Sequence, residues 1–325
     1  MGPLVSILIP CFNAERWVAQ AIESALAQTW PLKEVIVVDD GSTDCSLQII
    51  KRFDGDIRWE AGPNRGSNGA RNRLLALSRG EWLQYLDADD CLRPGKIAQQ
   101  IGFVREHPHA DVVCSPTAWE GVIKGTIICT DTEIPEPRDP WILLASWRLP
   151  QTGGPLWKRE VLQRVGGWRA GQTCCQEHEL YCRLLEAKAR FEFCDGCLAV
   201  YRDLEHDSRI TRKSKGGEWE RQRLAILDRI EKCLEQRLEL TAQRRQAVND
   251  ARHELARKLW QIDRQLAMNT HKRIRGSDPS FLPSLASSSP LFYWIVYRVL
   301  GFRAAQIAAS YKRALSCSRG LALRS

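Results

Sequence analysis

Several features that define common classes of protein are missing from this sequence of 325 residues. The first residues, MGPLVSILIPCFN, have neither a basic start nor a small-residue cleavage site after an apolar core, so no signal peptide is expected. No apolar run reaches the roughly 20 residues that a membrane-spanning helix needs. These absences favour a cytoplasmic protein and leave open a peripheral contact at the inner membrane face.

A paired cysteine pattern for zinc is also absent. Twelve cysteines are scattered along the chain, and in a reducing compartment we expect most of them to be buried thiols. The densest group has one C-x-x-C pair and consists of Cys174, Cys175, Cys182, Cys194 and Cys197. A structural zinc site needs four converging ligands, and no second C-x-x-C pair is present here, so zinc is disfavoured.

Glycine is missing from the loop that follows the first predicted strand. This loop lies within IPCFNAE, residues 9–15. A nucleotidyltransferase would normally carry a glycine-rich phosphate-binding loop at this place, so that class is disfavoured.

Apolar runs and helical patterns alternate through the first half of the chain. Continuous apolar runs at 5–10 and 34–39 are typical of strands that are buried on both faces. Apolar residues at helical spacing follow Asn13, which we expect to cap a helix, and recur at 69–78 and 94–107. This alternation predicts an α/β fold with a Rossmann-like, mostly parallel central sheet flanked by helices.

Acidic residues gather where the predicted strands end. Asp39 and Asp40 end the second strand, and Asp87, Asp89 and Asp90 follow the strand EWLQYL. Clustered carboxylates either lie in solvent or hold a cation, and Mg²⁺ and Mn²⁺ favour oxygen ligands that include substrate phosphates. Because ligands of parallel sheets bind at the carboxyl ends of the strands, these groups predict a shared site.

The second half of the chain predicts fewer regular elements. We expect an irregular, partly β connection over 117–150 and a helix within 153–168 that ends at two glycines. An amphipathic helix over 177–189 and a last strand over 191–202 complete the predicted compact part.

Positive charge is concentrated in the last third of the chain. The net charge is +8, and residues 211–275 hold about 17 Lys and Arg against 9 Asp and Glu, with about 6 against 1 in 276–325. Apolar residues at helical spacing across 216–270 predict two or three amphipathic helices, and 276–290 predicts a linker rich in Ser and Pro. The apolar segment 291–302 predicts a final helix that either packs on this appendage or lies at a membrane interface.

Four segments resemble the inverting family 2 glycosyltransferases of GT-A fold. They occur in the expected order and are VSILIPCFNAERWVAQAIESALAQT, EVIVVDDGSTD, NRGSNGARNRLLALSRGEWLQYLDADD and, more weakly, GGW…CCQEHELYCRLL. The resemblance covers residues 4 to about 203. It implies a nucleotide-sugar-binding half at 1–110 and an acceptor-binding half at 111–210. Outside the resemblance lie the predicted basic helical appendage at 211–275 and the linker with an amphipathic C-terminal helix at 276–325.

The resemblance also implies a donor site for a nucleotide diphosphate sugar, with a UDP-sugar favoured. The residues that match the family's nucleotide-binding positions are Pro10, Phe12, Glu15, Asp39, Asp40, Arg71 and Asp87. Asp89, in the D-x-D motif, matches the metal ligand, which implies Mn²⁺ or Mg²⁺ as cofactor. Phe12 departs from the Tyr that the family often carries.

An acidic residue before the amphipathic helix is the general base in this family. Glu177 occupies that position, with Glu179 as the alternate, and Gln176 replaces the first acid of the family's pair. Both glutamates also suit the first turn of a helix, where a negative charge complements the helix dipole. The implied activity is metal-dependent, inverting transfer of a hexosyl group to a hydroxyl acceptor, a saccharide or glycolipid in cell-surface polysaccharide or glycan assembly.

Two other hypotheses remain open at this point. Transfer to a polyprenyl phosphate would need no strong base, and a non-catalytic protein could use the basic tail to bind a membrane or nucleic acid. Nucleic-acid binding is not expected, because the basic residues alternate with acids and lack a recognition motif. His206 lies where the family has a loop over the donor phosphates, and Trp141, Trp147, Trp157 and Trp168 either stack on an acceptor sugar or pack in the core.

Overall fold

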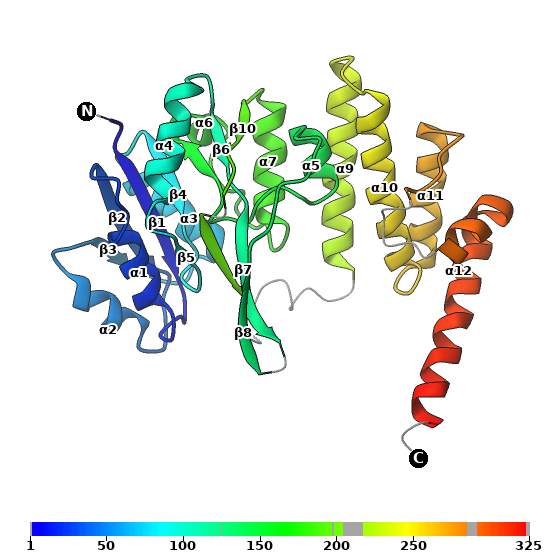
Figure 1. The fold of residues 1–325 in the computed structure, drawn as a ribbon, viewed down its shortest axis with the longest axis horizontal. Helices are drawn as coiled ribbons and strands as arrows, with labels where there is room; N and C mark the ends of the chain where they lie inside the picture. The colour runs from blue at the N-terminus through cyan, green and yellow to red at the C-terminus, as the bar shows by residue number, and fades with distance from the viewer. Residues whose placement is uncertain (1, 124, 197, 204–216, 285–290, 323–325) are drawn as a thin grey trace. The chain divides into compact units, whose positions relative to one another are not determined.

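The computed structural model describes residues 2–123, 125–196, 198–203, 217–284 and 291–322 (Figure 1). It divides into two compact units, Met1–Lys213 and Ser214–Ser325, which we call unit 1 and unit 2.

A seven-stranded sheet forms the centre of unit 1. Its order is β10-β6-β9-β4-β1-β2-β3. The strands are β1 (Val5–Cys11), β2 (Lys33–Asp39), β3 (Arg58–Ala61), β4 (Trp82–Tyr85), β6 (Val112–Cys114), β9 (Leu156–Lys158) and β10 (Phe191–Phe193). Pairs β1–β2, β1–β4, β2–β3 and β6–β10 are parallel, which confirms the mostly parallel sheet predicted from the continuous apolar runs.

One strand of this sheet was not predicted from the sequence. Residues 156–158, within the segment 153–168 in which we expected a helix, form β9 and pair antiparallel with both β4 and β6. Leu156 and Trp157 are completely buried there. Three residues carry too short a pattern to reveal a strand, so the sheet on both sides decides their conformation. The helix that follows, α6 (Arg159–Arg164), ends before Gly166 as expected.

A second sheet has the order β5-β11-β7-β8. Its strands are β5 (Cys91–Leu92), β7 (Thr117–Ile123), β8 (Thr126–Thr130) and β11 (Ala199–Asp203). The single last strand predicted over 191–202 is therefore wrong, because this segment divides into β10 in the large sheet and β11 in the small one. The predicted β content of 117–150 is present as the antiparallel pair β7–β8.

Helices cover the larger sheet of unit 1. They are α1 (Val18–Leu26), α2 (Ser46–Ile50), the short 3₁₀ helix η1 (Lys51–Phe53), α3 (Ser67–Leu77), α4 (Lys96–Glu106), α5 (Pro140–Ala145), α6 and α7 (Gln176–Glu186). One core cluster joins alternate residues of β1 to the buried sides of α1 and α4, including Ile7, Ile22 and Ile97. Alternate residues of β1 thus pack against the buried residues of α1, which recur at helical spacing, on one face of the sheet.

Unit 2 is helical, as predicted for the appendage. Its helices are α9 (Glu218–Gln236), α10 (Ala242–Leu259), α11 (Arg264–Ser277) and α12 (Leu291–Ala322). Thr241 and Asp263 cap α10 and α11 by accepting hydrogen bonds from backbone N–H groups. A cluster that includes Trp260, Ile274 and Phe302 forms the core.

The predicted linker is more ordered than its composition indicated. Residues 276 and 277 belong to α11, and Phe281 is buried in the core of unit 2 with 1% of its surface exposed. The indole N–H of Trp294 donates to the carbonyl of Pro283 over 2.9 Å. One large aromatic side chain is enough to fix part of a Ser- and Pro-rich segment against the core.

The last helix, α12, is longer than predicted and changes direction at Gly301, whose φ is 79°. No helix in the described ranges is long and apolar enough to cross a membrane.

Candidate active site

The carboxyl ends of β1, β2 and β4 lie along one edge of the larger sheet. Parallel pairing places Cys11 opposite Asp39 and Leu8 opposite Tyr85. Asp87 comes two residues after β4 on the same edge. The acidic groups that the sequence placed after separate strands are therefore neighbours in space, at the usual ligand-binding edge of an α/β sheet.

The loops after β1 and β2 are held together by hydrogen bonds. The backbone N–H of Asn13 donates to Ser42 Oγ (2.9 Å), and that of Thr43 donates to Asn13 Oδ1 (2.8 Å). Glu15 Oε2 accepts from the N–H of Cys45 over 2.9 Å. Asn13 does not cap a helix as predicted, because α1 begins at Val18 and Asn13 has a positive φ of 49°. Its side chain fixes the neighbouring loop instead.

Two predicted nucleotide-site residues lie at the end of β1. Pro10 is partly buried, and Phe12 exposes 50% of its side chain surface. An aromatic ring left half in solvent at a ligand-binding edge has a free apolar surface on which a planar group can stack.

Asp39 and Asp40 are both buried but differ in their partners. Asp40 Oδ1 accepts from the backbone N–H of Arg65 over 2.8 Å, and burial raises the pKa of the Asp40 carboxyl above its ordinary value. Asp39 Oδ2 accepts from the N–H of Ser42 over 3.2 Å. Asp39 Oδ1 has no hydrogen-bond partner in the described part of the chain. A buried carboxylate oxygen without a partner is a ready acceptor for a ligand N–H or O–H.

Arg71, on α3, connects the two halves of the site. Its Nη2 lies 2.9 Å from Asp87 Oδ1 and 4.0 Å from Glu177 Oε1, and its Nη1 donates to Gln176 Oε1 over 2.7 Å. The guanidinium also lies over the ring of Trp168, 4.6 Å from its centroid. Burial alone would lower the pKa of Arg71, but the carboxylates of Asp87 and Glu177 outweigh it and raise that pKa, so the side chain is a fixed cation.

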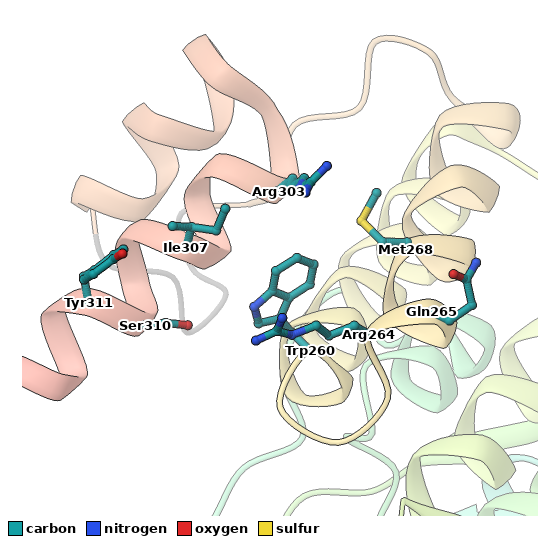
Figure 2. A pocket seen from close by; sticks show the side chains of 8 residues that line it. All are labelled: Trp260, Arg264, Gln265, Met268, Arg303, Ile307, Ser310 and Tyr311. Atoms are coloured by element: carbon teal, nitrogen blue, oxygen red, sulfur yellow. The ribbon is translucent and has the colours of Figure 1, made fainter.

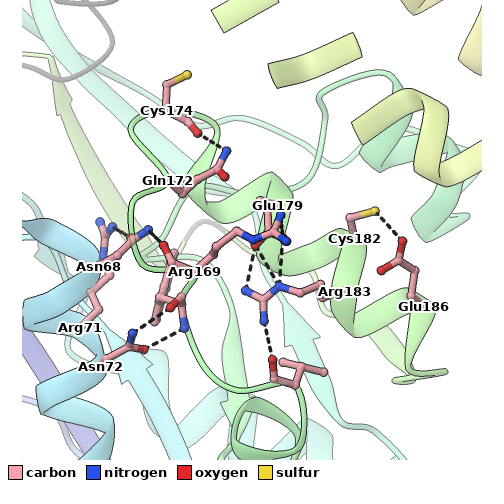
Figure 3. Close-up of polar contacts among 12 residues, drawn as sticks. Asn68, Arg71, Asn72, Arg169, Gln172, Cys174, Glu179, Cys182, Arg183 and Glu186 are labelled. Atoms are coloured by element: carbon pink, nitrogen blue, oxygen red, sulfur yellow. Dashed lines mark hydrogen bonds and ion pairs between the residues drawn. The ribbon is translucent and has the colours of Figure 1, made fainter. Parts of the chain in front are cut away.

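Hydrogen bonds from α3 hold the loop that precedes α7 (Figure 3). Asn72 exchanges two hydrogen bonds of 2.8 Å with the backbone of Trp168, and Asn68 Nδ2 donates to the carbonyl of Arg169 over 2.8 Å. These side chains occupy one face of α3 together with Arg71. The same helix therefore supplies the cation and positions the segment that leads into Gln176.

Glu177 lies in the first turn of α7 and is held by a side chain that the sequence did not indicate. The hydroxyl of Thr152 donates to Glu177 Oε1 over 2.6 Å. Thr152 is almost completely buried, whereas the side chain of Glu177 exposes 22% of its surface. One carboxylate oxygen is thus fixed by Thr152 while the group as a whole stays open to solvent.

Glu179 differs from Glu177 in its burial and in its partners. Its side chain is 2% exposed and forms ion pairs with Arg183 at 2.8 Å and Arg169 at 3.3 Å. Figure 3 shows the carboxylate of Glu179 between these two arginines. This burial and pairing favour a structural role for Glu179 and leave Glu177 as the more accessible of the two predicted bases.

The three aspartates after β4 have different surroundings. Asp87 faces Arg71, and Asp89 is partly buried. Asp90 is buried and accepts a hydrogen bond of 2.9 Å from the backbone N–H of Arg202 at β11, so it fixes the turn. Asp87 and Asp89 are thus less buried than Asp90, and Asp87 is paired with the cation of the predicted site.

A divalent cation suits this donor set only together with a substrate. No group of three or more His, Cys, Asp or Glu residues is arranged to hold a metal within the described ranges. Mg²⁺ at nucleotide sites is bound by one or two carboxylates and takes other ligands from phosphates and water. The carboxylates of Asp87 and Asp89 fit that pattern, whereas they would not form a metal cage by themselves.

A buried lysine connects Thr152's loop to the sheet. Lys96 Nζ donates to the side-chain oxygens of Gln84 and Gln100. The amides of these glutamines in turn donate to the carbonyls of Gly153 and Gly154, each over 3.0 Å. Burial lowers the pKa of Lys96 to about 7. This network of polar core residues holds the loop against β4. No periodic pattern in the sequence predicted it.

The remaining sequence-based candidates are mostly buried or lie outside the described ranges. Trp141, Trp157 and Trp168 are buried and belong to the core, whereas Trp147 is partly exposed and stacks on His178 with a centroid separation of 3.3 Å. His206 and Cys197 lie outside the described residues. Cys174, Cys175, Cys182 and Cys194 are buried free thiols.

Comparisons with known proteins agree with this fold. Residues 6–151 match the family model described as Glycosyl transferase family 2. An uncharacterized glycosyltransferase of Nostoc sp. is 32% identical over 170 residues, which cover 50% of this chain and 52% of that protein. The chain spans about half or less of the length of the curated relatives that it matches.

Two solved structures share the architecture. TarS 1-349 of S. aureus in complex with UDP-GlcNAc gives a TM-score of 0.65 with 16% identity and covers 96% of this chain and 92% of that one. The mannosyltransferase PcManGT of Pyrobaculum calidifontis in complex with GDP-Man and Mn²⁺ gives 0.50 with 18% identity, over 96% and 87%. At these identities the likeness establishes the fold.

Unit 1 has the GT-A fold, and its polar edge lies at the carboxyl ends of the parallel strands. The match to the family 2 glycosyltransferases covers residues 6–151 of the chain, which lie in unit 1.

Proposed function

We propose that this protein is a metal-dependent, inverting glycosyltransferase that moves a sugar from a nucleotide diphosphate sugar to a hydroxyl acceptor. One observation carries the proposal: Arg71 lies within 2.9 Å of Asp87 and 4.0 Å of Glu177. A donor-side carboxylate and a base candidate from the second half of unit 1 therefore meet at one buried cation. Residues 1–110 supply the donor half of this site, and residues 111–210 supply the acceptor half.

The donor-binding side is formed by Asp39, Asp40 and Phe12. The unpartnered Oδ1 of Asp39 and the carboxylate of Asp40 are placed to accept hydrogen bonds from a nucleobase, beside the exposed ring of Phe12. Pro10 and Glu15 shape the same loop edge, and Glu15 acts through its bond to Cys45. UDP is the favoured nucleotide, because the structural neighbour TarS binds UDP-GlcNAc and UDP.

Mn²⁺ or Mg²⁺ is the proposed cofactor, with Asp89 as its ligand and Asp87 on the ribose side. When bound, the cation would neutralise the diphosphate leaving group. The neighbour PcManGT, whose structure contains GDP-Man and Mn²⁺, supports this assignment. Arg71, a buried cation on the same edge, adds positive charge for the diphosphate.

Glu177 is the proposed general base. Its position at the start of α7 and its partial exposure allow it to accept the proton of an attacking hydroxyl. Attack opposite to the leaving diphosphate, in a single displacement, inverts the anomeric centre. Thr152 holds one oxygen of the carboxylate and leaves the other to face the acceptor. The acceptor we propose is a saccharide or glycolipid hydroxyl.

We also infer peripheral contact with the inner membrane face through α12. Leu291, Ile295 and Val299 expose 64%, 49% and 73% of their surfaces on this helix. Apolar side chains exposed along one helix are typical of interfacial helices.

Thermal unfolding with a panel of nucleotide sugars tests the donor site. A Mn²⁺-dependent shift for one nucleotide sugar, lost in Asp89→Ala, is the expected result. A ligand at about 100 times its dissociation constant stabilises the folded state by about 2.7 kcal/mol, which is readily measured. The absence of any shift would overturn the proposed donor site.

Transfer assays with Glu177→Gln test the base. Loss of a general base lowers turnover by about 10²- to 10⁴-fold, and donor binding should be unchanged. Glu177→Gln activity close to that of the wild type would instead indicate an acidic acceptor, such as a polyprenyl phosphate, that needs no strong base.

A further inference from the structure

A groove in unit 2 is lined by arginines and apolar side chains together (Figure 2). It runs between α11 and the part of α12 that follows Gly301 and has a volume of about 560 Å³. Its lining residues are Trp260, Arg264, Gln265, Met268, Arg303, Ile307, Ser310 and Tyr311. Trp260 and Arg303 lie on opposite walls in Figure 2.

The groove is positively charged. Arg264 and Arg303 line it, and none of its eight lining residues is Asp or Glu. Neither arginine forms an ion pair with another residue in the described part of the chain, although Arg264 lies over the ring of Trp260 at 5.5 Å. The whole of α12 contains no acidic residue. Two guanidinium groups without counter-ions favour an anionic ligand.

The same region exposes apolar side chains. Ile307 and Tyr311 in the groove are 42% and 69% exposed, and Met268 is 37% exposed. In the part of α12 before Gly301, Phe292 and Leu300 are 52% and 68% exposed. The contact of this part with the core is made by other residues, among them Tyr293 and Tyr297, which are buried in the core of unit 2. The exposed apolar surface is therefore not required by the fold of unit 2.

Cationic and apolar groups on one surface restrict the choice of ligand. A soluble anion or a nucleic acid would pair with the arginines but would leave the aliphatic side chains in water. A phospholipid with an anionic headgroup satisfies both, because its phosphate meets the guanidinium groups and its acyl region receives the apolar side chains.

From these observations we propose that the groove between α11 and α12 binds the headgroup of an anionic phospholipid and thereby anchors unit 2 on a membrane. The proposal names the lipid class and the site for the membrane contact inferred above. It does not depend on the transferase activity.

Vesicle sedimentation of the full chain tests the charged part of the site. The wild type should bind vesicles of phosphatidylcholine with phosphatidylglycerol and not vesicles of phosphatidylcholine alone. The variant Arg264→Gln with Arg303→Gln should lose about 30-fold in affinity, since each basic residue at an anionic surface contributes about fivefold. The matched control, Lys232→Gln with Lys272→Gln, removes two exposed charges of unit 2 outside the groove and should lose less than about threefold.

A second pair of variants tests the apolar part. Val299→Asp on α12 should weaken vesicle binding, whereas Leu238→Asp should not, although Leu238 is 95% exposed after the end of α9. Circular dichroism of each variant checks that it is folded, and donor binding should be the same as in the wild type.

Three outcomes would overturn the proposal. These are no binding to anionic vesicles, equal losses in the groove variant and its lysine control, and retention on DNA but not on vesicles. Because donor binding by unit 1 is measured separately, failure of the lipid site and failure of the proposed transferase function give different results.

Discussion

The carboxylate of Glu177 is held more firmly than its position in a first helical turn requires. Thr152 donates to it over 2.6 Å from a buried position, and Arg71 lies on the same oxygen side at 4.0 Å. A base must be within about 3 Å of the proton that it accepts, so its orientation affects turnover directly. We therefore regard Thr152 as a positioning residue for the proposed base.

Thr152→Val tests this role with a side chain of nearly the same shape. Loss of the hydrogen bond should lower kcat by about 10- to 100-fold, because misplacement of a reacting group by about 1 Å has effects of that size. The KM for the donor should stay within about twofold, since the hydroxyl of Thr152 donates to the proposed base Glu177 and not to a residue of the proposed nucleotide site. Steady-state kinetics with varied donor separates the two constants.

Thr152→Ser is the matched control, because it restores the hydroxyl and removes only a methyl group. It should recover most of the turnover lost in Thr152→Val. Equal losses in both variants would show that packing, rather than the hydrogen bond, explains the effect.

The sequence predicted Arg71, Asp87 and Glu177 as members of one site, and the structure brings these three side chains together. That prediction was based on the polar residues at the ends of the predicted strands and on the family motifs. Thr152 was missed because it lies in a loop whose path depends on the buried contacts of Gln84 and Gln100. The ion pair of Glu179 with Arg169 was not predicted, because Arg169 comes from another loop, which helical spacing does not reveal.

Among the secondary-structure elements, α10 carries an unusual buried group. His253 on this helix is 1% exposed and surrounded by rings of Phe281, Tyr293, Tyr297 and Phe302. Neither of its ring nitrogens has a hydrogen-bond partner in the described part of the chain. Burial, with Arg257 and His271 nearby, lowers the pKa of His253 to about 3. His253 is therefore neutral in the folded state at pH 4 and above.

This histidine predicts an acid-sensitive unit 2. The unfolded chain protonates His253 near pH 6.5, whereas the folded chain does so only near pH 3, so stability is lost as the pH falls through this window. Between pH 6.5 and pH 4 the loss from this group is on the order of 3 kcal/mol. Replacement by Phe should remove that part of the pH dependence, as measured by chemical unfolding at several pH values.

His109→Phe serves as the control, because His109 is exposed and lies in unit 1. It should leave the unfolding of unit 2 unchanged at every pH. If His253→Phe keeps the full pH dependence of the wild type, other groups control the acid sensitivity of the helical unit.

The sequence predicted long elements better than short ones. Helices such as α7 and α10 have enough turns to show a period, and β1 and β2 have continuous apolar runs. The three-residue strands β9 and β10 lack any such pattern, and their conformation comes from pairing with neighbours that are distant in sequence. Local propensity cannot specify a strand of that length.

At the scale of the whole molecule, the two units carry separate cores and separate chemistry. The proposed donor site uses residues of unit 1, whereas His253 and the groove proposed to bind lipid belong to unit 2. The net positive charge also lies in the C-terminal part, with about 23 Lys and Arg against 10 Asp and Glu after residue 210. Ligands and pH should therefore act on different units.

Differential scanning calorimetry of the full chain should show two unfolding transitions, one for each unit. Nucleotide sugar with Mn²⁺ should raise only the transition of unit 1, because a ligand stabilises only the unit that binds it. A fall in pH from 7 to 4.5 should lower the transition of unit 2 more than that of unit 1, and His253→Phe should reduce the difference. Both treatments shifting a single transition together would mean that the units unfold cooperatively, and the separation of donor binding from membrane binding would then have to be abandoned.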